Sequence, residues 1–233
     1  MIKNKAGLKY RYLLFDADDT LLDFLRAEKT ALKKVLIKNR LPHDDMTIKT
    51  YSRINLKCWK MYEEGKIKRD EIFSLRFSEF LNILNSSANP LDVNHQYFLE
   101  LSKCHFVFPY AKNLLKYAAK NYNLYIITNG VALTQRTRLR QSGLDKYFKE
   151  LFISEELGFQ KPSSQFFDRV VSSIGDQNRD NYLIIGDSLS SDILGGKNAE
   201  IDTMLITLRK ASSSFDIVPN YEAFSLKELK KML

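Results

Sequence analysis

The sequence predicts an α/β protein: a doubly wound, Rossmann-like parallel sheet with an all-α helical domain inserted into it. Short apolar runs, each followed by polar or acidic residues, alternate with amphipathic helix patterns, which is typical of a parallel sheet with helices on both faces. Residues 23–107 interrupt this alternation, since they contain only helix patterns. The 233 residues are enough to bury a sizeable core. We therefore expect an α/β core from residues 1–22 and 108–233 and a helical domain from residues 23–107.

Five short apolar runs predict the strands of the sheet. Each is bounded by charged or turn-forming residues and is too short for an ordinary helix. The runs are Tyr10–Phe15, Leu124–Ile127, Leu151–Ile153, Tyr182–Ile185 and Thr203–Ile206. Because the carboxyl ends of parallel strands meet at one edge of the sheet, functional groups should gather in a crevice there.

Helix patterns separate these runs and fill the insertion. In the α/β core they are Ala111–Lys120, Leu133–Gln141, Ser163–Ile174 and Leu189–Asn198. In the insertion they are Ala27–Asn39, Thr47–Glu63, Arg69–Leu84 and Leu91–Cys104. Pro42, Gly65 and the turn-forming residues 85–90 separate the helices of the insertion. The serine run Ser212–Ser214 predicts a loop.

The composition excludes a disordered, collagen-like or disulfide-stapled protein, because 44% of the residues are hydrophobic and only two are cysteines. Cys58 and Cys104 lack metal-ligand spacing, which indicates reduced thiols and a cytoplasmic protein. The apolar run Leu13–Phe15 is too short for a signal segment or a membrane span, so no membrane partner is expected. A net charge of +8 leaves open a nucleic-acid binder or an enzyme that takes small anionic substrates.

Two carboxylates follow the first predicted strand, in the segment from Phe15 to Thr20. Alternate residues of a strand share one side, so Asp16 and Asp18 are expected to converge while Ala17 points away. Crowded carboxylates repel each other, and a bound cation or a proton-transfer role would offset that cost. An acidic turn or a helix N-cap is the simpler alternative.

Further carboxylates follow the fourth predicted strand. Asp187 lies directly after it, and Asp192 is expected about one turn into the next helix. If the first and fourth strands are neighbours, Asp16, Asp18 and Asp187 face one small volume. Oxygen ligands of this kind favour a hard cation, most plausibly Mg²⁺. Asp192 also suits a helix N-terminus, which is an independent reason for an acid there.

Two further loops carry groups suited to a phosphate. Thr128, Asn129 and Gly130 offer a hydroxyl and backbone N–H groups at the end of the second predicted strand. Lys161 precedes Pro162 at the start of a predicted helix, where its ammonium would lie beside the crevice. Alone, the Thr128–Gly130 loop is typical of an ordinary turn, and Lys161 before Pro162 is typical of a surface boundary. Both, however, follow predicted strands, as the two acidic loops do, and lie between them in the sequence.

These four segments resemble the ordered motifs of the haloacid dehalogenase superfamily of phosphotransferases, and the resemblance covers essentially the whole chain with an α-helical cap between the first two motifs. Residues 15–24 with Arg26, Ala27 and Glu28 are most similar to its pyrimidine 5′-nucleotidase branch. The resemblance implies the following roles. The nucleophile is Asp16, the general acid and base is Asp18, and the phosphate ligands are Thr128, Asn129 and Lys161. Mg²⁺ is held by Asp16, Asp187 and the Asp18 backbone carbonyl, with Asp192 orienting these ligands or Lys161.

The expected function is therefore a Mg²⁺-dependent phosphomonoesterase that hydrolyses nucleoside 5′-monophosphates through an aspartyl-phosphate. Dehalogenase members lack a carboxylate at the position of Asp18, so its presence favours phosphate esters. A phosphatase or phosphomutase for a sugar phosphate stays open, and a non-catalytic nucleic-acid-binding module is the remote alternative. Arg76 and Trp59 are candidates for substrate specificity. A monomer or weak dimer without a stable nucleic-acid partner is expected.

The positive charge is concentrated in the inserted helical domain. From Arg26 to Arg76 the chain has fourteen Lys and Arg against seven Asp and Glu. We therefore interpret the excess as a basic domain that helps to gather phosphorylated substrates rather than as a nucleic-acid footprint.

Overall fold

The computed structural model describes residues 2–3, 7, 9–209 and 217–233. It divides the chain into two compact units, an α/β unit of residues 1–23 and 107–233 and a helical unit of residues 24–106. The predicted loop Ser212–Ser214 lies outside the described residues. Each unit is considered by itself below.

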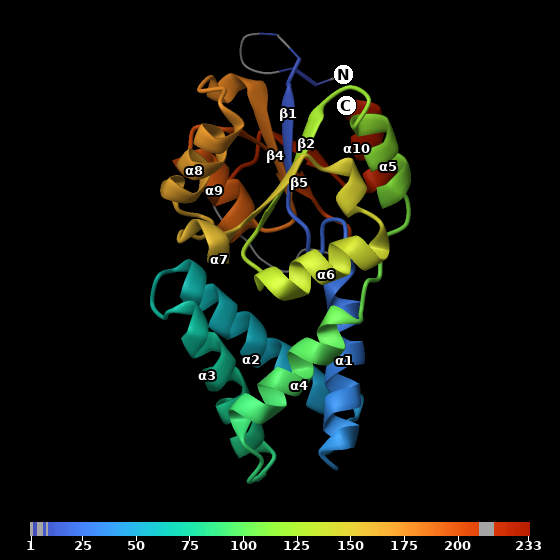
Figure 1. The fold of residues 1–233 in the computed structure, drawn as a ribbon, viewed down its shortest axis with the longest axis vertical. Coiled ribbons are helices and arrows are strands. Elements are labelled where there is room, and N and C mark those ends of the chain that lie inside the picture. The colour runs from blue at the N-terminus through green and yellow to red at the C-terminus, as the bar shows by residue number, and fades with distance from the viewer. Residues whose placement is uncertain (1, 4–6, 8, 210–216) are drawn as a thin grey trace. The chain divides into compact units, whose positions relative to one another are not determined.

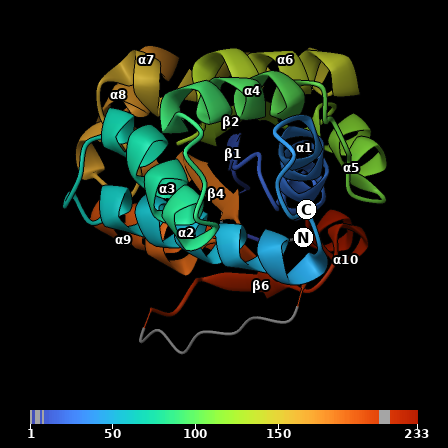
Figure 2. The same cartoon turned by 90° about the horizontal axis from the view of Figure 1, so that it is seen from below.

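The α/β unit contains one parallel sheet (Figure 1), and its described strands follow the order β3-β2-β1-β4-β5-β6. Their bounds are β1 Tyr12–Phe15, β2 Asn123–Thr128, β3 Glu150–Ile153, β4 Tyr182–Gly186, β5 Asp202–Ile206 and β6 Tyr221–Ala223. This confirms the doubly wound fold, and β1 and β4 are direct neighbours with Phe15 opposite Ile185. The edge strand β6 (Figure 2) was not predicted, because three residues are too few for a strand pattern.

Helices cover both faces of this sheet. Their bounds are α5 Ala111–Ala118, α6 Ala132–Ser142, α7 Ser154–Leu157, α8 Ser164–Ile174, α9 Leu194–Asn198 and α10 Leu226–Met232. The 3₁₀ turns η1 Asp145–Tyr147 and η2 Arg179–Asn181 and the π-helical turn η3 Leu189–Ile193 complete the unit. The short helices α7 and α10 were not predicted, and the predicted helix Leu189–Asn198 divides into η3 and α9.

The alternation of side chains along β1 builds one hydrophobic core on each face of the sheet. Leu13 and Phe15 join the core that contains residues of α5 and α10. Tyr12 and Leu14 join the opposite core, which contains residues of α8. In Figure 1, α5 and α10 accordingly lie on one side of the sheet, and α8 lies on the other. Both faces of β1 are buried, so its four residues read as a continuous apolar run.

The helical unit consists of α1 Phe24–Lys38, α2 Asp45–Glu63, α3 Arg69–Ile83 and α4 Pro90–Ser102. Two of these helices have side-chain N-caps. Asp44 accepts hydrogen bonds from backbone N–H groups in the first turn of α2, and Asn89 does the same for α4. In this unit α2 packs on α3, and α4 packs on both α1 and α3. Cys58 and Cys104 are buried in its core. Among the described residues, no helix has both the length and the apolar character that a membrane crossing requires.

Candidate active site

The carboxyl ends of three adjacent strands define the candidate site. Because the sheet order is β2-β1-β4, the residues that follow Phe15 and Gly186 lie side by side, and Thr128 ends the strand on the other side of β1. This is the edge at which an open parallel sheet binds its ligands.

Lys161 is a buried cation at this site. Its Nζ donates hydrogen bonds to Oδ1 of Asp16 at 2.7 Å, to Oδ1 of Asp192 at 2.6 Å and to the carbonyl of Ile127 at 3.1 Å. Burial by itself lowers the pKa of this ammonium, but the carboxylates of Asp16 and Asp192 outweigh it and raise the pKa above its ordinary value. Lys161 is therefore charged at neutral pH and fixed by three acceptors.

Asn129 holds the loop that carries Lys161. Its Oδ1 accepts the backbone N–H of Lys161 and its Nδ2 donates to the Lys161 carbonyl, both at 2.9 Å. The side chain of Asn129 is thus held in a two-way bond to the Lys161 backbone, and the backbone N–H of Asn129 stays the predicted contact with a phosphate. The amide fixes the position of Lys161 relative to β2.

The hydroxyl of Thr128 has both lone pairs engaged. Its Oγ1 accepts hydrogen bonds from the Gly130 N–H at 3.1 Å and from Nε2 of Gln135 at 2.8 Å. A hydroxyl has two lone pairs and one hydrogen, so these contacts leave Thr128 a hydrogen to donate. Such a donor suits an oxyanion.

Asp192 is fully buried and orients Lys161. While Oδ1 accepts from Lys161, Oδ2 accepts the backbone N–H of Ser188 at 3.1 Å. The carboxylate lies so close to Gly186 that a Cβ built there would come within 2.2 Å of Asp192 Oδ2. The glycine at the end of β4 is therefore required for the Asp192–Lys161 contact.

This close approach makes Gly186→Ala a test of the site. The added methyl group must displace Asp192, because contacts below 3.0 Å do not occur for a Cβ, and Lys161 then loses one of its two anionic partners. Loss of such a supporting contact typically costs about 10–100-fold in activity. We expect that loss in kcat for the phosphate-ester hydrolysis that the sequence predicts. Gly158→Ala is the control for general destabilisation, because it strains the backbone at φ 76° but places no atom within 4 Å of the added Cβ. Full activity in Gly186→Ala would contradict the role of Asp192.

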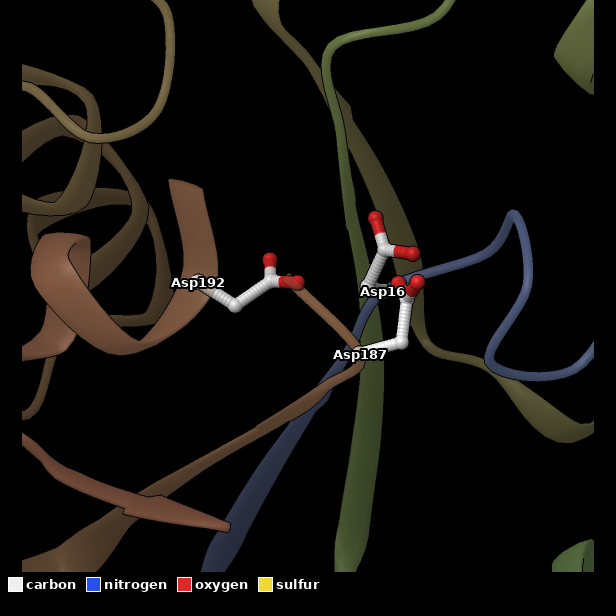
Figure 3. A group of neighbouring side chains, drawn as sticks. All are labelled: Asp16, Asp187 and Asp192. Carbon is white, nitrogen blue, oxygen red and sulfur yellow. The ribbon is translucent and has the colours of Figure 1, made fainter. Parts of the chain in front are cut away.

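Three carboxylates meet at this edge, and Figure 3 shows Asp16 beside Asp187 with Asp192 directed toward them. Oxygen atoms of Asp16, Asp187 and Asp192 all lie within 4.8 Å of one another. The hydroxyl of Thr20 lies between two of them, 3.3 Å from Asp16 Oδ2 and 3.4 Å from Asp187 Oδ1. Thr20 was not among the predicted site residues.

Burial and mutual repulsion raise the pKa values of two of these acids, Asp16 and Asp187. Burial raises the pKa of Asp16 to about 7, against the opposing effect of Lys161 and with a further rise from Asp192. Desolvation raises the pKa of Asp187 well above its ordinary value, and the neighbouring carboxylates of Asp16 and Asp192 add to it. Hard oxygen donors that repel one another in this way fit Mg²⁺, which would favour their charged forms. Asp192 is already engaged by Lys161 and Ser188, so Asp16 and Asp187 are the carboxylates better placed to bind it.

Asp18 does not share the partners of Asp16. Its Oδ1 accepts from Nη1 of Arg138 at 2.6 Å and its Oδ2 accepts from Nε2 of Gln135 at 2.9 Å. The two carboxylates still act on each other, since the charge of Asp18 contributes to the raised pKa of Asp16, although β1 ends at Phe15 and the chain turns, with Asp19 at φ 55°. Each carboxylate consequently has its own cation, which limits the repulsion between them.

Sequence reasoning missed Gln135 and Arg138. Both lie on α6 and are 1% exposed, although polar side chains of a helix usually face solvent. A Cβ on Gly130 would lie 2.6 Å from Nε2 of Gln135, so the glycine of the Thr128–Gly130 loop makes room for that amide. The three-residue spacing of Gln135 and Arg138, which places both on one face of a helix, was the only available signal.

The two specificity candidates lie in the helical unit. Arg76 is only 2% exposed, and its Nη1 and Nη2 donate to Oδ1 of Asn55 at 2.8 Å and Oδ1 of Asn94 at 2.6 Å. It is a structural residue of that unit rather than a substrate contact, because both ends of its guanidinium are engaged inside the core. Trp59 is partly buried against the same core, with its ring 5.9 Å from that of Tyr62. Trp59 stays a candidate.

Comparison with known proteins identifies the family. The model of the haloacid dehalogenase-like hydrolases matches residues 10–200. Two relatives named pyrimidine 5′-nucleotidase are similar over nearly their whole length. PynA of Streptococcus pneumoniae is 35% identical, over 94% of this chain and 93% of that protein. YjjG of Escherichia coli is 31% identical, over 97% of this chain and 99% of that protein.

A solved structure supports the same assignment. The HAD-hydrolase YfnB of Bacillus subtilis is 39% identical, and its magnesium-bound crystal structure, which reveals interdomain movement, superposes with a TM-score of 0.90. The superposition covers 96% of this chain and 98% of YfnB. With the parallel sheet, the four polar loops at its edge and these matches taken together, the chain belongs to the haloacid dehalogenase-like hydrolases.

Proposed function

We propose that this hydrolase is a Mg²⁺-dependent phosphomonoesterase that acts on nucleoside 5′-monophosphates through an aspartyl-phosphate on Asp16. The observation that carries the proposal is the pair of carboxylates with separate cations, Asp16 with Lys161 and Asp18 with Arg138. Phosphoryl transfer to a carboxylate needs one acid as nucleophile and a second as proton donor, and the two must differ in environment. The nucleotide substrate is supported by the names of the relatives PynA and YjjG.

Asp16 is the proposed nucleophile. A carboxylate attacks a dianionic phosphate poorly, because like charges repel, so positive charge must lie beside both groups. Lys161 supplies a fixed cation 2.7 Å from Asp16 Oδ1. Asp16 and Asp187, with the backbone carbonyl of Asp18, would hold Mg²⁺, which supplies the remaining charge neutralisation.

Asp18 is the proposed general acid and base. As an oxygen of Asp16 forms its bond to phosphorus, the bond from phosphorus to the ester oxygen breaks, and the proton of Asp18 passes to that leaving oxygen. Water then attacks phosphorus while Asp18 takes its proton, and Asp16 leaves as a carboxylate. The side chain of Asp18 is 26% exposed, which leaves it accessible to a leaving group.

The phosphoryl group would be bound by donors from two loops. Thr128 has a hydroxyl hydrogen to offer, the backbone of Asn129 has an N–H, and Lys161 has its ammonium. These donors are held by other contacts before a substrate arrives, so little reorganisation is needed at the moment of transfer. Trp59 is the proposed candidate for contact with the base, and the enzyme is proposed to act as a monomer or weak dimer.

A substrate panel tests the proposal. The purified protein with Mg²⁺ is assayed for phosphate release from nucleoside 5′-monophosphates, sugar phosphates and glyceraldehyde 3-phosphate, with and without EDTA. We expect turnover of at least one pyrimidine nucleotide, and loss of that activity in EDTA with recovery on excess Mg²⁺. Brisk turnover of a sugar phosphate alone would refute the nucleotide assignment. Activity that persists in EDTA would refute the metal requirement, and salt-sensitive binding of DNA or RNA without any hydrolysis would favour the binding-module alternative.

A further inference from the structure

Helix α6 carries a buried polar pair that contacts the proposed general acid. Nη1 of Arg138 lies 2.6 Å from Oδ1 of Asp18, and Nε2 of Gln135 lies 2.9 Å from Oδ2. Both oxygens of the Asp18 carboxylate are thereby engaged by donors from one helix. The rotation of the carboxylate is restricted on both sides, which a single hydrogen bond would not achieve.

The two donors are also joined to each other and to the phosphate loop. Arg138 Nη1 donates to Gln135 Oε1 at 3.2 Å, so the orientation of the amide is defined. The same Nε2 that contacts Asp18 donates to Thr128 Oγ1 at 2.8 Å. Gln135 therefore links the proposed acid to a proposed phosphate ligand, and its Nε2 approaches the space over Gly130 that a Cβ would fill.

Burial and charge make this arrangement specific to Asp18. A buried guanidinium is costly unless an anion and hydrogen bonds compensate it, and the Asp18 carboxylate provides that anion. The side chain of Arg138 is 1% exposed, whereas that of Asp18 is 26% exposed. The guanidinium is thus inside the fold, whereas the Asp18 carboxylate that it contacts is partly exposed.

We propose that Arg138 and Gln135 are positioning residues that fix the Asp18 carboxylate for proton transfer to the leaving oxygen, with Gln135 also orienting the Thr128 hydroxyl. This rests on the proposed phosphomonoesterase activity. Proton donation by a placed acid contributes about 10²–10⁴-fold to a rate, and it depends on hydrogen-bond reach to the reacting oxygen. If Arg138 and Gln135 act through Asp18, their replacement should slow the reaction most for a leaving group that needs a proton.

The leaving group therefore supplies the test. A nucleotide releases a strongly basic alkoxide, whereas 2,4-dinitrophenyl phosphate releases a weakly basic phenolate that needs no proton. First-turnover release of each product, measured by quenched flow and stopped flow, reports formation of the phosphoenzyme alone. In Arg138→Met, we expect about a 100-fold slower first turnover with the nucleotide and less than about a 3-fold change with the aryl phosphate. Gln135→Met should slow both substrates somewhat, because Thr128 binds the phosphate of either one, but it should slow the nucleotide more. Arg138→Lys should recover part of the nucleotide rate.

Two comparisons separate the possible outcomes. Arg140→Met, an exposed arginine on the same helix, is the matched control and should behave like the wild type. In an Asp18→Asn background, Arg138→Met should add almost nothing, because residues that act as one unit are not additive. Equal losses on both substrates, or additive losses, would overturn the positioning role while leaving the phosphomonoesterase proposal intact. A wild-type protein inactive on both substrates would overturn the proposed function and this inference with it.

Discussion

Replacing Asp16 with asparagine is expected to abolish phosphate release, with kcat lowered by about 10⁴-fold or more, as is usual when the nucleophile of a covalent mechanism is removed. The amide has nearly the same size as the carboxylate but does not attack phosphorus. The substitution also removes one of the two anions bound to the buried Lys161. The loss should therefore appear in kcat rather than only in KM.

Two measurements separate a lost nucleophile from a lost fold. Acid quenching of the wild type during turnover of a ³²P-labelled substrate should trap labelled protein, and Asp16→Asn should trap none. Asp168→Asn changes an exposed aspartate on α8 of the same unit and is the control, with activity expected to match the wild type. Labelled protein in the Asp16→Asn variant would mean that another side chain receives the phosphoryl group.

The largest expected effect on stability is that of Arg76→Ala. One buried network joins the helical unit: Arg76 of α3 donates to Asn55 of α2 and Asn94 of α4, and Asn55 donates to Glu28 of α1 at 2.7 Å. Removing the guanidinium takes a buried cation out of the network that holds Glu28, which is 2% exposed, and it opens a cavity among aromatic rings. Breaking a buried ion network in this way costs about 3–5 kcal/mol.

Trp59 makes this prediction measurable in the helical unit itself. It is the only tryptophan of the chain and packs against the core of that unit, so its fluorescence follows unfolding there. Urea unfolding should give a free energy of unfolding about 3–5 kcal/mol lower in Arg76→Ala. Arg53→Ala on the exposed side of α2 should stay within about 0.5 kcal/mol of the wild type. The double variant Glu28→Gln with Arg76→Met should cost less than Arg76→Met alone, and equal costs would mean that packing rather than charge explains the loss.

Much of the fold could be predicted because the signals were strong and local. The apolar run that ends at Phe15 and the run that ends at Ile185 identify buried strands, and their alternation with helices predicts a parallel sheet. That these two strands are neighbours is known only from the structure. The edge strand β6 was missed because three residues carry too little pattern. The π-helical turn η3 was missed because its geometry depends on the tertiary contacts of Asp192, which no sequence period records.

The candidate site was predictable where residues follow strands and unpredictable where they sit on a helix. Asp16, Asp187 and Thr128 are located by the strands that precede them. Arg138 looks like any charged residue of a surface helix, and only the position of Asp18 in the fold explains why it is buried. For Arg76 the error was the reverse. The sequence suggested a substrate contact, but Arg76 is buried and forms hydrogen bonds inside the helical unit.

The division of the α/β unit into two separate stretches of sequence has a consequence for how the chain folds during synthesis. Strand β1 lies between β2 and β4 in the sheet but precedes the whole helical unit in the chain. The four helices of residues 24–106 share a core of their own, in which α1 packs on α4, so the unit can fold once α4 has left the ribosome. Strand β1 must wait for its β4 partner until Gly186 has been synthesised, so its apolar residues are exposed longest. Translation stalled before β4 should therefore yield a folded helical unit joined to an aggregation-prone α/β fragment.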